Sequence, residues 1–139
     1  MKHLGLTHII LSGLVVWAVP FLVSMPFFDR GGNLLIDIFA FKTLMILVSS
    51  LIGLWLLARF LGKSQTKQHH TGLAIGLIWL GINWVLDFLI LLPLQGIGPQ
   101  EYFLATGLRY LHIPFAGFFM GLALHSHAKE VEVSGRTAR

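Results

Sequence analysis

The chain has 139 residues, of which 55% are hydrophobic and 12% are charged, and its mean hydropathy is +0.78. A soluble domain carries about 25% charged residues, so the composition excludes an ordinary soluble protein, and the length leaves room for one domain. Cysteine is absent, which excludes disulfides, thiolate metal sites and cysteine nucleophiles. The net charge of +4 does not indicate nucleic-acid binding, because the basic residues stand at the ends of apolar segments.

Four long apolar segments follow one another along the chain, at residues 6–28, 34–61, 72–93 and 102–124. Each has the roughly 20 residues that an α-helix needs to cross the roughly 30 Å hydrocarbon core of a bilayer. The first is longer than the hydrophobic region of a secretory signal, so we expect a retained helix. The sequence therefore predicts an all-α integral membrane protein. We expect an antiparallel bundle of four transmembrane helices in one domain at residues 1–128, with a polar cytoplasmic tail at residues 129–139.

The distribution of basic residues predicts the orientation. The N-terminus, the predicted loop at residues 59–70 and the tail together hold Lys2, Arg59, Lys63, Lys67, Lys129, Arg136 and Arg139. The two opposite loops hold Asp29 with Arg30, and Glu101. The positive-inside rule therefore places both termini in the cytoplasm.

Three of the four segments carry a charge in their interior: Lys42 in the second, Asp87 in the third and Arg109 in the fourth. Counted from the predicted outer ends of the helices, all three lie roughly 9–12 Å below the outer surface. A charge at such a depth costs a few kcal/mol on insertion scales and normally has a partner or faces water. We therefore predict that Asp87 forms an ion pair with Arg109, with Lys42 or with both.

Helical periodicity places small and polar residues on one face of three helices. These faces hold Gly72, Gly76, Trp79, Asn83 and Asp87 in the third helix, Ile38, Lys42, Met45, Ser49 and Gly53 in the second, and Ala105, Arg109, His112 and Ala116 in the fourth. We expect one polar cluster, with a hydrogen bond between His112 and Asn83 and with Asp37 at the outer rim. Two interpretations stay open: an architectural cluster that fixes helix register, or a path for an ion or solute. The candidate binding residues are Asp87, Arg109, Lys42, Asn83, His112 and Ser49.

Small residues at four-residue spacing indicate close packing of the helices. The pairs are Gly72 with Gly76, Gly117 with Gly121, and Ser49 with Gly53. We expect them to pack within the chain rather than to form a dimer. Pro20 and Pro114 each remove a backbone donor, and we expect them to bend the first and fourth helices.

Six of the seven histidines fall at the predicted cytoplasmic end, namely His3, His8, His69, His70, His125 and His127. They lack a metal-binding spacing such as H-E-x-x-H, so we predict no metal site. Haem would need a second axial ligand at the depth of His112, and no other histidine lies there, so we predict no cofactor. No P-loop, GxGxxG or GxSxG motif occurs, so the sequence does not favour an enzyme.

Three stretches taken together carry a resemblance to a family: DIFAFK at residues 37–42, NWVLD at 83–87 and GLRYLHIP at 107–114. They resemble a family of small four-helix prokaryotic integral membrane proteins whose function is not established. The likeness covers most of residues 17–121. It implies that the lysine, the Asn–Asp pair and the arginine belong to the family's pattern, and it implies no catalytic or binding role.

These features predict a multi-pass protein of a prokaryotic cytoplasmic membrane. The first hypothesis is a channel or transporter for a small ion or solute in which Asp87 binds a cation or proton. Four helices enclose little space, so we expect this function to need a homo-oligomer. The alternative is an accessory or assembly subunit of a larger membrane complex, whose charge cluster is architectural. The expected partners are the lipid bilayer and either further copies of the chain or that complex, and not nucleic acid.

Overall fold

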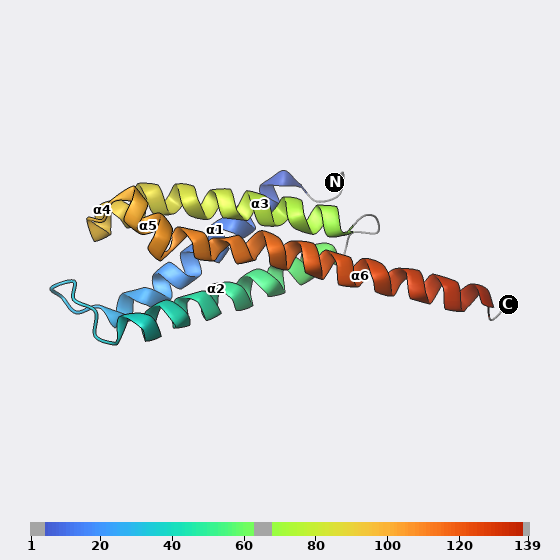
Figure 1. Cartoon of the computed structure of the whole chain (residues 1–139), viewed down its shortest axis with the longest axis horizontal. Coiled ribbons are helices and arrows are strands. Elements are labelled where there is room, and N and C mark those ends of the chain that lie inside the picture. The colour runs from blue at the N-terminus through green and yellow to red at the C-terminus, as the bar shows by residue number, and fades with distance from the viewer. Residues whose placement is uncertain (1–4, 63–67, 138–139) are drawn as a thin grey trace.

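The computed structural model describes residues 5–62 and 68–137. Of the residues named above, Lys2, His3, Lys63, Lys67 and Arg139 lie outside these ranges. Within them every regular element is helical, and four helical stretches are long and apolar enough to span a membrane: Leu6–Phe27, Ile38–Leu61, His69–Leu94 and Gly107–Ser126. This result confirms the prediction of an all-helical chain with four spans, which indicates an integral membrane protein. Consecutive spans run in opposite directions (Figure 1).

The first two helices are joined by a folded loop. Helix α1 covers Leu6–Ser24 and is followed by a short 3-10 turn, η1, at Met25–Phe27. Helix α2 covers Ile38–Leu61 and begins later than the expected residue 34, because the backbone of Leu34 pairs with that of Phe28. The Asp37 carboxylate then accepts hydrogen bonds from two backbone N–H groups of the first turn, which is the role of an N-cap.

The third span is continuous but not uniform. Helix α3 (Gln68–Leu86) passes into a π-helical turn, η2 (Asp87–Leu91), and then into the short α4 (Leu92–Gln95). Pro93 offers a physical reason for the wider turn, because it has no N–H to donate and its ring crowds the carbonyl four residues before it. The third span ends at Gly96, whose φ of 65° is a left-handed conformation that suits glycine.

The fourth segment differs most from its prediction, which was one helix over residues 102–124. The structure has a short helix α5 (Pro99–Ala105), a 3-10 segment η3 (Gly107–Leu111) and a long helix α6 (His112–Thr137). Thr106 separates the first two with a non-helical φ of −136°. Pro114 therefore lies in the first turn of α6, where a missing N–H is tolerated, and not within one helix over residues 102–124 that it was expected to bend. At its other end α6 extends beyond the other helices (Figure 1) and covers most of the predicted tail.

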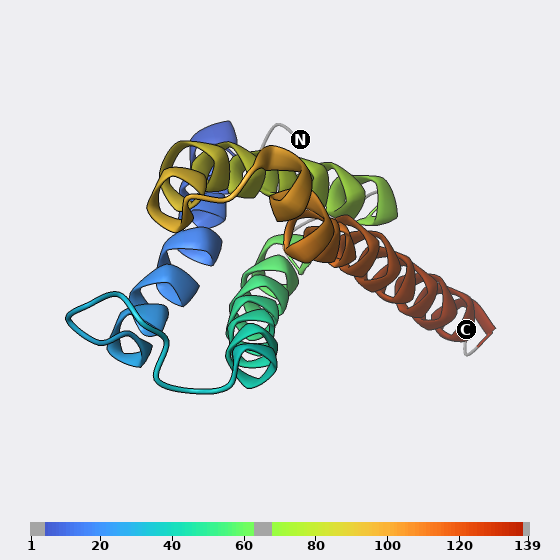
Figure 2. The ribbon, with the colours of Figure 1, turned by 60° about the vertical axis from the view of Figure 1, so that its left-hand side comes forward.

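The tightest contact in the bundle joins α3 to α6 at glycines. A Cβ atom on Gly72 would lie 2.0 Å from the carbonyl oxygen of Gly117, and one on Gly76 would lie 2.6 Å from the Cα atom of Pro114. The two backbones therefore touch without side chains between them, which small residues permit in membrane helices. The prediction that Gly72, Gly76 and Gly117 pack within the chain is confirmed. Figure 2 shows α1 and α2 on one side of this pair.

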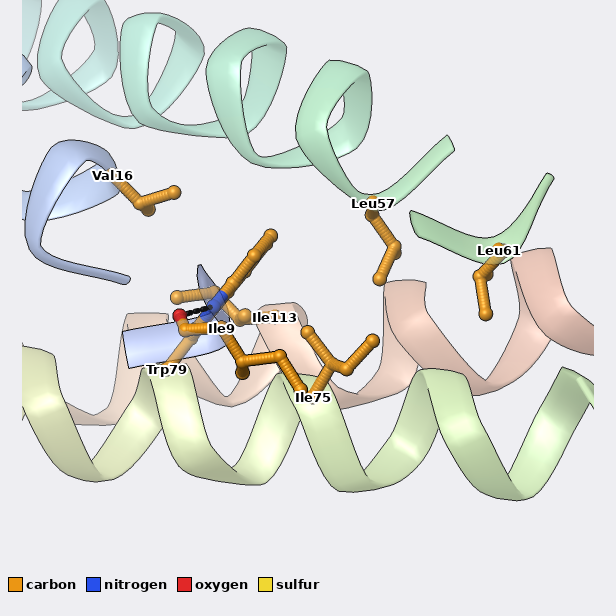
Figure 3. Packing of buried hydrophobic residues seen from close by; sticks show 7 residues of the cluster. All are labelled: Ile9, Val16, Leu57, Leu61, Ile75, Trp79 and Ile113. Carbon is orange, nitrogen blue, oxygen red and sulfur yellow. Dashed lines mark hydrogen bonds between the residues drawn. The ribbon is translucent and has the colours of Figure 1, made fainter. Parts of the chain in front are cut away.

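Helix α1 packs on α3 through a second glycine and a tryptophan. A Cβ atom on Gly13 would meet the side chains of Ile82 and Trp79 at 2.7 and 2.8 Å. The Trp79 indole N–H donates a hydrogen bond of 2.9 Å to the backbone oxygen of Ile9 (Figure 3). Helix α2 contributes Leu57 and Leu61 to the same buried cluster. The four spans thus share one core.

Candidate functional site

The polar face predicted for α3 is the most buried face of that helix. Asn83 and Asp87 are each only 1% exposed, and so is Trp79 on the same face. The prediction succeeds here because α3 is a regular α-helix from Gln68 to Leu86, so its 3.6-residue period holds along its whole length. An acidic side chain buried inside a membrane span is costly, and its partners decide what it can do.

Neutral aromatic donors surround Asp87. The Trp17 indole N–H donates to Oδ1 at 2.6 Å, and the Tyr102 hydroxyl donates to Oδ2 at 2.5 Å. The Tyr110 hydroxyl also lies near this carboxyl group. We call Trp17, Asp87, Tyr102 and Tyr110 the Asp87 cluster. It ties together α1, the π-helical turn, α5 and η3.

The local structure explains how Tyr102 reaches the acid. Pro99 stands in the first turn of α5, and one turn later the Tyr102 side chain is completely buried, with its ring 5.3 Å from that of Phe88. Burial, and then the hydrogen bond and charge of Asp87, raise the pKa of the Tyr102 hydroxyl above its ordinary value. The hydroxyl therefore keeps its proton at neutral pH and acts as a donor.

The ion pair predicted for Asp87 is wrong. Within the described residues neither Lys42 nor Arg109 pairs with an acidic side chain, and Asp87 is instead contacted by neutral tryptophan and tyrosine side chains. Lys42 lies in the first turns of α2, because that helix starts only at Ile38. Arg109 is exposed, because the break at Thr106 and the 3-10 geometry of η3 rotate it away from the face that a continuous helix would give. The three charges do not form one cluster.

His112 also has partners other than the predicted Asn83. Its Nδ1 lies 2.5 Å from the backbone oxygen of Arg109, and its Nε2 lies 3.1 Å from the hydroxyl oxygen of Ser50. A carbonyl oxygen can only accept, so Nδ1 carries the hydrogen, and in the neutral ring Nε2 accepts the hydrogen of Ser50. Asn83 instead donates to the backbone oxygen of Trp79 in its own helix at 2.8 Å.

A cavity of about 110 Å³ lies between α2 and the other three long helices. Its polar lining side chains are Ser49 and Ser50 from α2 and His112 from α6, with Trp79 of α3 beside them. Val16, Leu57 and Ile113, seen around Trp79 in Figure 3, form much of its apolar wall. The structure thus brings together two of the predicted site residues, Ser49 and His112, whereas Arg109 and Lys42 do not line this cavity.

At the other end of the bundle three histidine rings meet. The centroid of the His69 ring lies 4.2 Å from that of His70 and 5.5 Å from that of His125. In the described part of the chain no group of three or more His, Cys, Asp or Glu side chains has an arrangement suited to a metal ion.

Reasoning from the sequence missed Trp17, Tyr102, Tyr110 and Ser50. The signal available was their type: tryptophan and tyrosine have apolar bodies with one polar tip, and a buried tip finds a partner.

No family model, characterised protein or solved structure matches this chain.

Proposed function

We propose that this protein is a small membrane transporter that moves protons, with Asp87 as the proton-binding group. The observation that carries the proposal is a carboxyl group, 1% exposed inside a membrane-spanning bundle, whose hydrogen-bond partners are neutral. An ionised carboxylate without a facing cation is costly in such surroundings, and a bound proton neutralises it. The tryptophan and tyrosine donors stabilise the ionised form, so the surroundings of Asp87 accommodate both its protonated and its ionised form.

Polar groups on either side of Asp87 support a route. Tyr102 belongs to α5, which lies outside the four spans, so its hydroxyl connects the carboxyl group to that end of the bundle. In the other direction, Asn83 lies one helical turn from Asp87 on the same face of α3, on the side of Trp79 and the cavity. A four-helix chain encloses little space, so we propose that the transporter is a homo-oligomer in a prokaryotic cytoplasmic membrane. The basic residues favour cytoplasmic termini.

Proton flux into liposomes tests this proposal. Purified protein is reconstituted with a pH-sensitive dye inside, and a potassium gradient with valinomycin drives proton movement. We expect Asp87→Asn to lower the flux at least tenfold, because asparagine keeps the shape and hydrogen-bonding capacity of the side chain but does not titrate. Glu101→Gln, at an exposed acid in α5, is the matched control and should leave the flux unchanged. Equal flux in wild type and Asp87→Asn would refute the proposal.

A second function, an accessory subunit of a larger membrane complex, is favoured by one observation. The partners of Asp87 belong to three separate segments of this same chain, so the cluster also has the form of an architectural joint. Native mass spectrometry of protein extracted gently from its membrane separates the two functions. A homo-oligomer supports the transporter, and a fixed stoichiometry with unrelated chains supports the accessory subunit.

A further inference from the structure

Ser49 differs from three other hydroxyl-bearing residues of the long helices. Ser12, Thr43 and Ser126 each donate a hydrogen bond to the carbonyl oxygen four residues earlier in their own helix. This local bond is the usual way to satisfy a hydroxyl group in an apolar helix. The Ser49 hydroxyl makes no such bond and has no hydrogen-bond partner in the part of the chain that the structure describes, although the residue is only 6% exposed.

The Ser49 side chain lines the cavity between α2 and the other long helices. A hydroxyl group that lacks a partner in apolar surroundings costs free energy, and this cost is removed when a molecule in the cavity supplies the missing hydrogen bond. Beside it, Ser50 donates to His112 Nε2 in the neutral ring, so the Ser50 oxygen still has lone pairs with which to accept a hydrogen bond.

The walls define the chemistry of the occupant. Among the described residues that line the cavity none is charged, and most are aliphatic or aromatic. The volume of about 110 Å³ is of the order of the roughly 150 Å³ apolar cavity known to hold one benzene molecule. Gly53 and Ala116 on the wall are partly exposed and Leu54 is exposed, so the cavity reaches the outer face of the bundle, which a bilayer would cover.

We propose that this cavity is a binding site for one small neutral amphiphile, of the size of a single ring, that enters from the bilayer. Its apolar body contacts Leu57, Trp79 and Ile113, and its single hydroxyl group hydrogen-bonds to Ser49. Asp87 is not among the lining residues, so the site is separate from the proposed proton-binding group and does not depend on it.

A matched pair of probes tests the hydrogen bond. The full chain in lipid nanodiscs is titrated with 4-fluorophenol and with fluorobenzene, and binding is followed by fluorine NMR against empty nanodiscs. We expect saturable binding of both probes, with 4-fluorophenol the tighter. Ser49→Ala should weaken 4-fluorophenol by about two- to tenfold, the range for one net hydrogen bond, and leave fluorobenzene unchanged. Ser12→Ala is the control, because that hydroxyl bonds within its own helix.

A filling variant tests the location. A Cβ atom on Gly53 would meet nothing within 4 Å, so Gly53→Leu can place its side chain in the cavity without displacing the backbone. We expect it to abolish saturable binding of both probes. Equal affinities for the two probes in wild type would mean that the hydroxyl group of 4-fluorophenol makes no hydrogen bond in the cavity, and no saturable binding would mean that the cavity holds neither probe. Either result overturns the proposal, as does 4-fluorophenol binding that Ser49→Ala leaves unchanged.

Discussion

The contact between α3 and α6 and the contact of α2 with the rest of the bundle differ in what lies between the helices. At Gly72 and Gly117 the two backbones touch, and no side chain fits between them. At Gly53 of α2 there is open space, and a cavity takes the place of packed side chains. In a bilayer, helix association depends on close packing and hydrogen bonds rather than on the hydrophobic effect. The α3–α6 pair is therefore the scaffold, and α2 is the helix beside which a small molecule can be held.

The Asp87 cluster joins helices in a third way, which is neither direct backbone contact nor packing beside a cavity. It holds α1 and α5 to the scaffold through hydrogen bonds to one carboxyl group, where the α3–α6 contact uses the backbone itself.

The largest effect is expected from Gly72→Ala. The added methyl group would lie 2.0 Å from the Gly117 oxygen, so the two helices must separate. Overpacking of this kind typically costs about 1–3 kcal/mol, and backbone contact on both sides favours the upper end. Unfolding by SDS in mixed micelles, followed by circular dichroism, measures the change. Gly81→Ala, where a Cβ atom would meet nothing within 4 Å, is the control and should not lower stability. Equal midpoints for the two variants would mean that the crossing is not the scaffold.

A smaller effect is expected at the start of α2. Asp37 caps this helix by accepting from the N–H groups of Phe39 and Ala40 at 2.9 and 3.0 Å. Removing such a cap typically costs about 1 kcal/mol. We expect Asp37→Ala to speed amide exchange at Phe39 and Ala40, measured by NMR, while Asp37→Asn keeps a capping oxygen and most of the protection. Unchanged exchange in Asp37→Ala would show that packing alone fixes this end.

A still smaller loss is expected for Trp17→Phe. The variant removes the N–H group that donates to Asp87 Oδ1. It keeps an aromatic ring that can stack on Phe21, whose ring centroid lies 4.9 Å from that of Trp17. A side-chain hydrogen bond between membrane helices contributes about 0.6 kcal/mol on average. A double-mutant cycle with Asp87→Ala, measured by the same SDS unfolding, isolates the pair, because Asp87→Ala removes the acceptor. If Trp17→Phe costs as much with alanine at position 87 as with aspartate, the two side chains do not stabilise each other.

The four spans and the buried face of α3 could be predicted from the sequence, because both depend on quantities that act along one helix. Length and apolarity give the spans, and an unbroken 3.6-residue period gives the face that holds Asn83 and Asp87. The same reasoning failed in the fourth segment. Thr106 breaks the helix there without a glycine or proline at that position, so the face extrapolated from Ala105 to Ala116 was rotated, and Arg109 is exposed.

The partners of Asp87 could not be predicted, because they depend on how separate segments meet. Attraction between opposite charges favoured Arg109 or Lys42, but burying a cation beside the acid would add a second desolvation cost. Tryptophan and tyrosine supply donors without that cost, and they come from α1, α5 and η3. The cavity could not be predicted either. Ser49 was a candidate site residue, but the sequence does not show that its hydroxyl group lacks a hydrogen-bond partner.

The smallest effect is expected in the loop between α1 and α2, far from the α3–α6 crossing. Asp29 Oδ1 accepts hydrogen bonds of 2.8 Å from the backbone N–H groups of Asn33 and Gly31. Hydrogen bonds from Asn33, and then those from Gly31 and Gly32, lower the pKa of the Asp29 carboxyl below its ordinary value of 3.8. A lowered pKa means that the folded loop favours the ionised form. The stability that the ionised Asp29 carboxyl group gives to the loop is therefore complete above pH 3.8 and is lost as the pH falls through the lower pKa of the folded loop.

An NMR pH titration should show the amide signals of Gly31 and Asn33 moving in this acidic range, while those of Gly72 and Gly117 stay fixed. In Asp29→Asn the loop signals should not titrate. Movement of the glycine signals in the same range would mean that the loop and the scaffold are coupled, and the division between a rigid α3–α6 pair and its more loosely held surroundings would fail.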